Sequence, residues 1–164
     1  MSEVNGVLFK YNNKVTISTT GVTTYTTSNQ AFQMASVFVP ANTFTVGDIV
    51  TIESQAQMDN TTSTRNWSYF RNTTDSLSGA QLLAIRAMSN TFINQYGMRR
   101  LAIRSSTTST LISATNSSFY SDFQAVSQPP STLVIDWTVN NFFIIAGQNG
   151  TGSQQRCIFL KISN

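Results

Sequence analysis

The chain has 164 residues, of which 40% are hydrophobic and only 10% are charged, and its formal net charge at pH 7 is +3. This length is that of about one domain with a sizeable core, whereas soluble domains usually carry roughly 25% charged residues. Ser, Thr, Asn and Gln, roughly two fifths of the sequence, keep it polar without charge. The weak positive charge argues against a nucleic-acid interface, and we expect no membrane span and no export signal.

Residues 1–30 are expected to form an N-terminal arm or an edge hairpin. The segment has few large apolar residues apart from residues 7–9 and 15–17, and pairs of Thr dominate its second half. Because β-branched Thr favours extended backbone, this half predicts either a strand added to a neighbouring sheet or a polar edge strand. We therefore divide the chain into an arm over residues 1–30 and a sandwich over residues 31–164.

Strand patterns begin after the arm. Residues 31–39 are rich in apolar side chains and end at Pro40, which cannot donate to a ladder. Residues 49–58 alternate apolar and polar side chains, which predicts a strand with one wet face. Residues 67–71 predict a short aromatic strand, and residues 80–88 fit either a helix or a strand. We favour the strand because every neighbouring segment is strand-like.

Short strands continue to the end of the sequence. The pattern predicts a turn over residues 89–97 and a strand over residues 98–105 with Leu101 and Ile103 facing inward. Further strands are expected at residues 110–113, 118–123, 133–139, 142–145 and 157–162, with a turn-rich loop over 147–153. Strands that recur about every ten residues, with no long helical segment between them, are typical of an antiparallel β-sandwich.

Residues suited to catalysis are scarce. The chain has no His, which removes the commonest general base and the commonest metal ligand. Cys157 lies in an apolar run and is expected to be a buried small hydrophobe. The seven carboxylates have ordinary structural interpretations and are Glu3, Asp48, Glu53, Asp59, Asp75, Asp122 and Asp136. We therefore expect that the protein is not an enzyme and binds neither a cofactor nor a metal. A glycosidase mechanism needs only two carboxylates, so this alternative stays open.

Two groups of side chains are candidates for contact with partners. The arginines Arg86, Arg99, Arg100 and Arg104 supply the main local positive charge, and we expect them at solvated strand edges. Aromatic side chains in short, polar-flanked segments suit the sandwich core, a subunit interface or stacking on sugar rings. The candidates for an interface or a ligand are Trp67, Tyr69, Phe70, Phe119, Tyr120 and Phe142.

Two stretches resemble parts of bacteriophage virion modules. The sequence WTVNNFFIIAGQ at residues 137–148, followed by a Gly/Ser/Gln loop and a last apolar strand, is similar to the terminal part of a phage fibre or head-decoration module. The sequence VPANTFTVGD at residues 39–48 resembles the strand-loop-strand opening of such modules. The resemblance covers roughly residues 30–164 and implies a jelly-roll sandwich that assembles as a homotrimer and projects from a capsid or tail.

The resemblance implies a non-enzymatic structural protein of a virion, made in the cytoplasm of a bacterial host. The leading hypothesis is a capsid-decorating or head-fibre protein whose arm, residues 1–30, holds the particle, with its own copies and other virion proteins as partners. One alternative is a tail-associated tip that binds host surface glycans through aromatic and amide side chains. Another is a carbohydrate-active enzyme with a carboxylate pair.

Overall fold

The computed structural model describes residues 2–4, 7–9, 15–18, 23–25, 31–58, 65–88, 94–111, 132–149 and 154–164. Within them every regular element is a β-strand, so the predicted all-β class is confirmed. The strands are β1 (Ser2–Val4), β2 (Val7–Phe9), β3 (Val15–Ser18), β4 (Thr23–Tyr25), β5 (Ala31–Val39), β6 (Ile49–Met58), β7 (Arg65–Asn72), β8 (Gln81–Met88), β9 (Asn94–Ser105), β10 (Thr108–Leu111), β11 (Thr132–Val134), β12 (Asn141–Asn149) and β13 (Gln154–Ser163).

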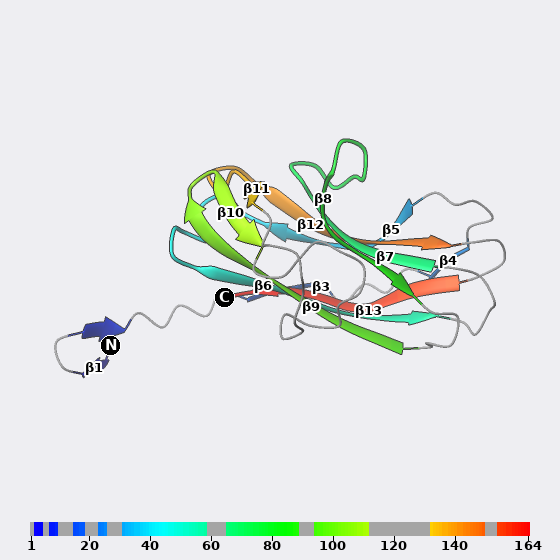
Figure 1. Cartoon of the computed structure of the whole chain (residues 1–164), viewed down its shortest axis with the longest axis horizontal. Helices are drawn as coiled ribbons and strands as arrows, with labels where there is room; N and C mark the ends of the chain where they lie inside the picture. The colour runs from blue at the N-terminus through cyan, green and yellow to red at the C-terminus, as the bar shows by residue number, and fades with distance from the viewer. Residues whose placement is uncertain are drawn as a thin grey trace.

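Two antiparallel sheets lie face to face and form a β-sandwich (Figure 1). In the described residues the seven-stranded sheet has the order β11-β10-β9-β6-β13-β3, and β4 also pairs with β13. The four-stranded sheet has the order β5-β12-β7-β8. Strands distant in sequence are thus neighbours, because β5 pairs with β12 and β6 pairs with both β9 and β13.

The core fills the space between the sheets. Strand β6 shows why, because Val50, Ile52, Ser54 and Ala56 are buried while the residues that alternate with them remain partly accessible, as the alternating sequence predicts. From the opposite sheet, Phe143 and Ile145 of β12 enter the same core. Complete burial of such a Val, Ile or Phe side chain contributes about 1.5–3 kcal/mol. The hydrophobic effect therefore holds the two sheets together.

Other predicted core residues also lie inside. Leu101 and Ile103 of β9 face inward as predicted, and Cys157 of β13 is completely buried, as expected for a small hydrophobe. Residues 80–88 form strand β8 (Gln81–Met88) and not a helix. The prediction from neighbouring strands was therefore correct.

Several predicted boundaries are wrong. Strand β9 already begins at Asn94, inside the turn expected over residues 89–97, and β12 runs to Asn149, into the loop expected over 147–153. Strands β10 and β13 begin earlier than predicted, at Thr108 and Gln154. The strand expected over residues 133–139 ends at Val134. There Asp136 Oδ1 accepts hydrogen bonds from the backbone N–H and the hydroxyl of Thr138, at 2.8 and 2.6 Å, which closes a turn.

The two stretches that resemble phage modules contact each other at one end of the sandwich. Phe44 is buried and packs edge-on against Trp137, with ring centroids 5.8 Å apart and an interplanar angle of 89°. The backbone N–H of Asn42 donates to the carbonyl of Trp137 at 2.8 Å. Asn42 has a φ of 60°, in the left-handed region that Asn tolerates in turns. The loop before β6 and the turn before β12 therefore form one packed unit.

Part of the N-terminal segment belongs to the sandwich. Strands β3 and β4 pair antiparallel with β13, opposite residues 160–163 and 154–156 respectively. Strands β1 and β2 form a separate two-stranded sheet, and Figure 1 shows this hairpin apart from the sandwich. The division at residue 30 stays a prediction, but the backbone pairing places β3 and β4 beside the strands that follow it.

Candidate functional site: two unlike outer faces of the sandwich

Apolar side chains lie in register on the outer face of the four-stranded sheet. Phe142 of β12 lies opposite Phe38 of β5, and Ile144 lies opposite Phe70 of β7, which in turn lies opposite Leu82 of β8. These positions alternate with core residues such as Val37 and Phe143, and directly paired residues point to the same side of a sheet. We call Phe38, Phe70, Leu82, Phe142 and Ile144 the neutral face.

The neutral face is partly accessible. Phe38 and Leu82 are 43% and 42% exposed, and Phe70 and Phe142 are half-buried. Ile144 lies at the centre and is buried although it is not part of the core between the sheets. Isolated exposed apolar residues are common, whereas a contiguous set in register suggests an interaction surface.

Polar residues on the same side of this sheet are uncharged. On β7 and β12, Asn66 Nδ2 donates to Gln148 Oε1 at 2.8 Å, and Ser68 lies beside Ala146. Among the side chains that the structure describes, no outward position of β5, β7, β8 or β12 carries a charge. A partner that covers this side would not have to remove water from an ion on these strands, which is the costliest part of burying polar surface.

A loop folds over one part of this face. It joins β7 to β8, and its Asp75 Oδ1 accepts a hydrogen bond from Gln33 Nε2 of β5 at 2.5 Å. Asn72 holds the loop, because its Nδ2 donates to the carbonyls of Ser76 and Ser78 at 2.8 and 3.0 Å. Figure 1 shows the loop standing above the sheet, over the label of β8. Asp75 therefore brings a carboxylate to the border of the neutral face.

The outer face of the seven-stranded sheet is different. Outward positions of β9 and β13 carry Arg100, Arg104, Arg156 and Lys161. Glu53 of β6 lies among them, and its Oε2 is 3.1 Å from Lys161 Nζ. The sandwich thus has one uncharged and one positively charged outer face.

The aromatic residues predicted from sequence occupy different places. Trp67 and Tyr69 lie inside the sandwich, 4% and 6% exposed, so they offer almost no surface to a partner. Phe70 and Phe142 lie on the neutral face, on the neighbouring strands β7 and β12. Phe119 and Tyr120 lie outside the described residues, as does the strand predicted over residues 118–123.

Sequence reasoning missed Phe38, Leu82 and Ile144 as members of this face. Phe38 stands between the buried residues Val37 and Val39, so the apolar run itself gives no sign of which side chain points outward. Leu82 precedes a bulge, because the register of β7 and β8 shifts between Tyr69 and Phe70. Only the pairing of β5, β12, β7 and β8 reveals the row, and long-range pairing cannot be read from local pattern.

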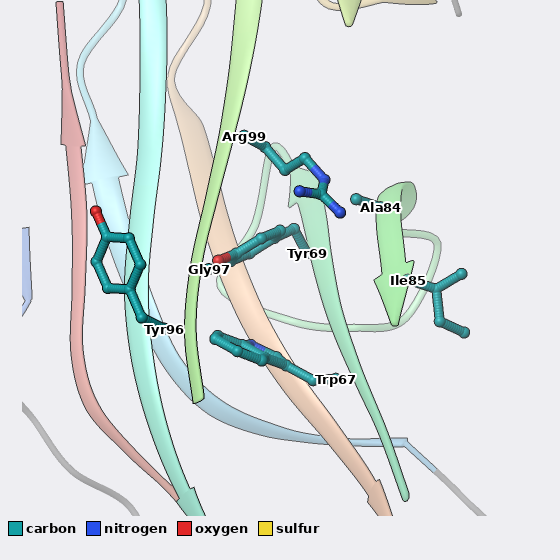
Figure 2. A pocket seen from close by; sticks show the side chains of 7 residues that line it. All are labelled: Trp67, Tyr69, Ala84, Ile85, Tyr96, Gly97 and Arg99. Carbon is teal, nitrogen blue, oxygen red and sulfur yellow. The ribbon is translucent and has the colours of Figure 1, made fainter. Parts of the chain in front are cut away.

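A small pocket lies between β8 and β9 (Figure 2). It has a volume of about 20 Å³, enough for about one water molecule. Trp67, Tyr69, Gly97 and Arg99 line it, and Figure 2 shows Tyr96 on the other side of β9, pointing away from it. The prediction that Arg99 is solvated is wrong, because its guanidinium is 3% exposed on an inward position of β9, where Nη1 donates to the carbonyl of Met98 at 2.9 Å.

The buried protic groups near the core are held protonated. Burial raises the pKa of Tyr69 well above its usual range, and the Tyr69 hydroxyl lies 2.6 Å from Ser54 Oγ. Burial also raises the pKa of the Cys157 thiol to about 12. A thiol needs a lowered pKa to act as a nucleophile near neutral pH, so Cys157 has the properties of a structural residue.

The described residues offer neither a metal site nor a membrane-spanning helix. No group of three or more His, Cys, Asp or Glu side chains that could hold a metal ion is present in the described parts of the chain. Those parts also contain no helix long and apolar enough to span a membrane. Comparisons with protein-family models, with curated proteins and with solved structures found no match. The two outer faces and the order of the strands are therefore the features of the molecule that bear on its function.

Proposed function

We propose that the chain is a non-enzymatic structural protein of a bacteriophage virion, a capsid-decorating or head-fibre protein that assembles as a homotrimer. The observation that carries this proposal is the neutral face. A sandwich of this size with a contiguous apolar surface in register, and no charge at the outward positions described on its strands, is suited to contact with copies of itself. The assignment to a phage virion comes from the resemblance of residues 39–48 and 137–148 to phage modules.

The strand order supports the jelly-roll part of the proposal. A jelly roll is a long antiparallel hairpin of eight strands rolled into two sheets, so its first strand pairs with its last and the pairing nests inward. If β3 and β4 are taken as one interrupted first strand, the nested pairs are all present, namely β3/β4 with β13, β5 with β12, β6 with β9, and β7 with β8. Strands β10 and β11 extend the larger sheet.

Jelly rolls occur in viral capsid proteins, lectins and cupins, so this topology alone does not choose a function. Cupin-type chemistry would need metal ligands, and the whole sequence lacks His, the commonest of them. Trp67 and Tyr69 cannot offer a lectin-type stacking surface, because they lie in the core beside a pocket of water size. A particle protein needs only a rigid sandwich and surfaces that bind its neighbours.

The energetics favour self-association through the neutral face. Phe38 and Leu82 are each a little less than half exposed, so covering either would contribute about 1 kcal/mol from the hydrophobic effect. In a cyclic trimer the contact is repeated three times, and the cost of fixing each subunit is offset by contacts on two sides. Obligate interfaces commonly exceed about 2,000 Å², so other residues must share the contact.

Two measurements test the proposal. Light scattering coupled to size-exclusion chromatography should give the mass of three chains of 18.1 kDa each at micromolar concentration. A stable monomer under these conditions would refute trimeric assembly. Gold-labelled antibodies against the chain should then bind intact phage particles, over the capsid or at the fibres. Particles that contain no such antigen would refute the virion assignment, even if the isolated protein is a trimer.

A further inference from the structure

The positively charged outer face of the seven-stranded sheet has a regular layout. Strands β13, β6 and β9 are adjacent, and rows of directly paired residues cross them. Arg156 lies in the row of Gln57, Lys161 in the row of Glu53, and Arg100 in the row of Thr51. Arg104 continues the outward series of β9, about 13 Å beyond Arg100 along the strand. The cations therefore form a track along the strands.

Positively charged side chains outnumber negatively charged ones on this track. The outward side chains of β6, β9 and β13 comprise four cations and one carboxylate, Glu53. Glu53 accepts contacts from Lys161 Nζ at 3.1 Å and from the Tyr96 hydroxyl at 3.1 Å. Arg156 Nε donates to Gln57 Oε1 at 2.6 Å, which fixes the side chain without neutralising its charge. The face thus keeps a net positive charge and attracts anions.

Aromatic rings lie in the row between those of Arg156 and Lys161. Tyr96 of β9 and Phe159 of β13 both lie opposite Gln55 of β6, one on each side, and their ring centroids are 6.4 Å apart. Tyr96 is 47% exposed, and the neighbouring Ile158 is 39% exposed. The amide of Gln55 lies between the two rings, and Gln57 and Thr51 lie in the rows of Arg156 and Arg100.

We infer that this basic face binds an acidic polysaccharide that runs along β9 and β13. Cations spaced along the strands suit the repeated carboxylates of such a chain, and the exposed ring pair offers an apolar surface for sugar rings. The amides and hydroxyls beside them can hydrogen-bond to sugar hydroxyls. A nucleic acid would favour a denser basic stripe, because its phosphates carry most of the affinity. This inference is independent of the proposed trimer, which uses the opposite face.

The test uses the full chain and polygalacturonate as the probe, with its methyl ester as the uncharged control. Isothermal calorimetry should detect binding to polygalacturonate at about 0.05 M salt, and about 1 M salt should abolish it, because the Debye length falls to about 3 Å. The methyl ester should bind much more weakly. Absence of binding to polygalacturonate at low salt would overturn the inference, as would equal binding of the ester.

Three variants locate the binding surface. Arg104→Gln should weaken binding about two- to fivefold, which is the range for one exposed ion pair. The control is Ser78→Glu, which makes the same change in net charge on the β7–β8 loop. This control should leave the affinity unchanged. Tyr96→Leu should weaken polygalacturonate binding but not binding of inorganic polyphosphate, an anion that has no ring to stack on Tyr96. If Arg104→Gln and Ser78→Glu weakened polygalacturonate binding equally, the loss of affinity would come from net charge alone. That result would overturn the assignment of the binding surface to β9 and β13. Tighter binding of DNA than of polygalacturonate would also refute the ligand class. The mass of each variant, measured in parallel, separates loss of binding from loss of assembly.

Discussion

Phe142 lies opposite Phe38 across the β5–β12 pair, with ring centroids 5.1 Å apart and an interplanar angle of 45°. Tilted aromatic pairs at this distance contribute about 0.5–1.5 kcal/mol beyond the area that they bury. Both rings are on the outer side of the sandwich, where Phe38 remains 43% exposed. The pair is thus fixed before any partner arrives, so little side-chain entropy would be lost on association.

Gly97 is required where β9 passes the aromatic core. A Cβ atom at this position would lie 2.9 Å from the Tyr69 hydroxyl and 3.0 Å from the indole ring of Trp67. We predict that Gly97→Ala lowers the free energy of unfolding by about 1–3 kcal/mol, the usual cost of overpacking. Denaturant-induced unfolding measures this change.

A double variant provides the control for Gly97. Tyr69→Phe removes the hydroxyl nearest to the new methyl group, at the expense of the 2.6 Å contact with Ser54. The combined loss of stability in Tyr69→Phe with Gly97→Ala should be smaller than the sum of the single losses. A fully additive result would show that the Tyr69 hydroxyl does not limit the space at β9, and an unchanged stability of Gly97→Ala would show that neither Tyr69 nor Trp67 does.

Stability should decrease in alkaline solution because of Cys157. Its ordinary pKa is 9.0, and burial raises the pKa in the folded chain to about 12. Between these values the unfolded state binds fewer protons than the folded state, so the stabilisation is complete below pH 9 and is lost as the pH rises towards about 12. One such group gives a slope of at most about 1.4 kcal/mol per pH unit.

Cys157→Ala removes this titration. Its free energy of unfolding, measured between pH 8 and pH 11, should fall less steeply with pH than that of the wild type. The smaller side chain also lowers the stability, but by an amount that does not depend on pH, so only the slopes are compared. Burial also raises the pKa of Tyr69, so part of the slope remains in the variant above pH 10. Identical slopes in the two proteins would contradict the burial of the thiol.

The strands of the sandwich could largely be predicted from local pattern, whereas their arrangement could not. The alternation in residues 49–58 reports directly which side of β6 is buried, and Pro40 marks the end of the preceding strand. By contrast, residues 135–139 have strand-like composition, yet the Asp136 carboxylate turns the chain because it bonds to Thr138. A side-chain hydrogen bond of this kind outweighs β propensity without changing the apolar pattern.

Only part of the neutral face could be predicted from the sequence. Phe70 and Phe142 could be selected because they are aromatic, but the same criterion selected Trp67 and Tyr69, which are core residues. Arg99 and Arg100 are neighbours in sequence, yet one points into the sandwich and the other outward, because successive side chains of a strand point to opposite faces of the sheet. Which side of a strand is covered depends on the packing of the sheets and not on composition.

The hairpin β1–β2 offers a test of the proposed attachment arm. Deleting residues 1–10 removes only this hairpin, whereas deleting residues 1–30 would also remove β3 and β4, which pair with β13. We predict that the shorter deletion leaves thermal unfolding and oligomeric mass unchanged but weakens binding to phage particles stripped of the protein. Undiminished binding in a co-sedimentation assay would show that the hairpin is not the anchor.

The central claim is that the neutral face joins the copies of the chain, and one pair of variants tests it directly. Leu82 and Ile158 are 42% and 39% exposed, on opposite outer faces, so Leu82→Glu and Ile158→Glu introduce the same charge at sites of similar accessibility. Burying the new carboxylate in an interface is costly, whereas one that stays in water is not. Light scattering should give a monomer for Leu82→Glu and a trimer for Ile158→Glu, with both variants folded by circular dichroism. A trimer for Leu82→Glu, or a monomer for Ile158→Glu alone, would contradict the account.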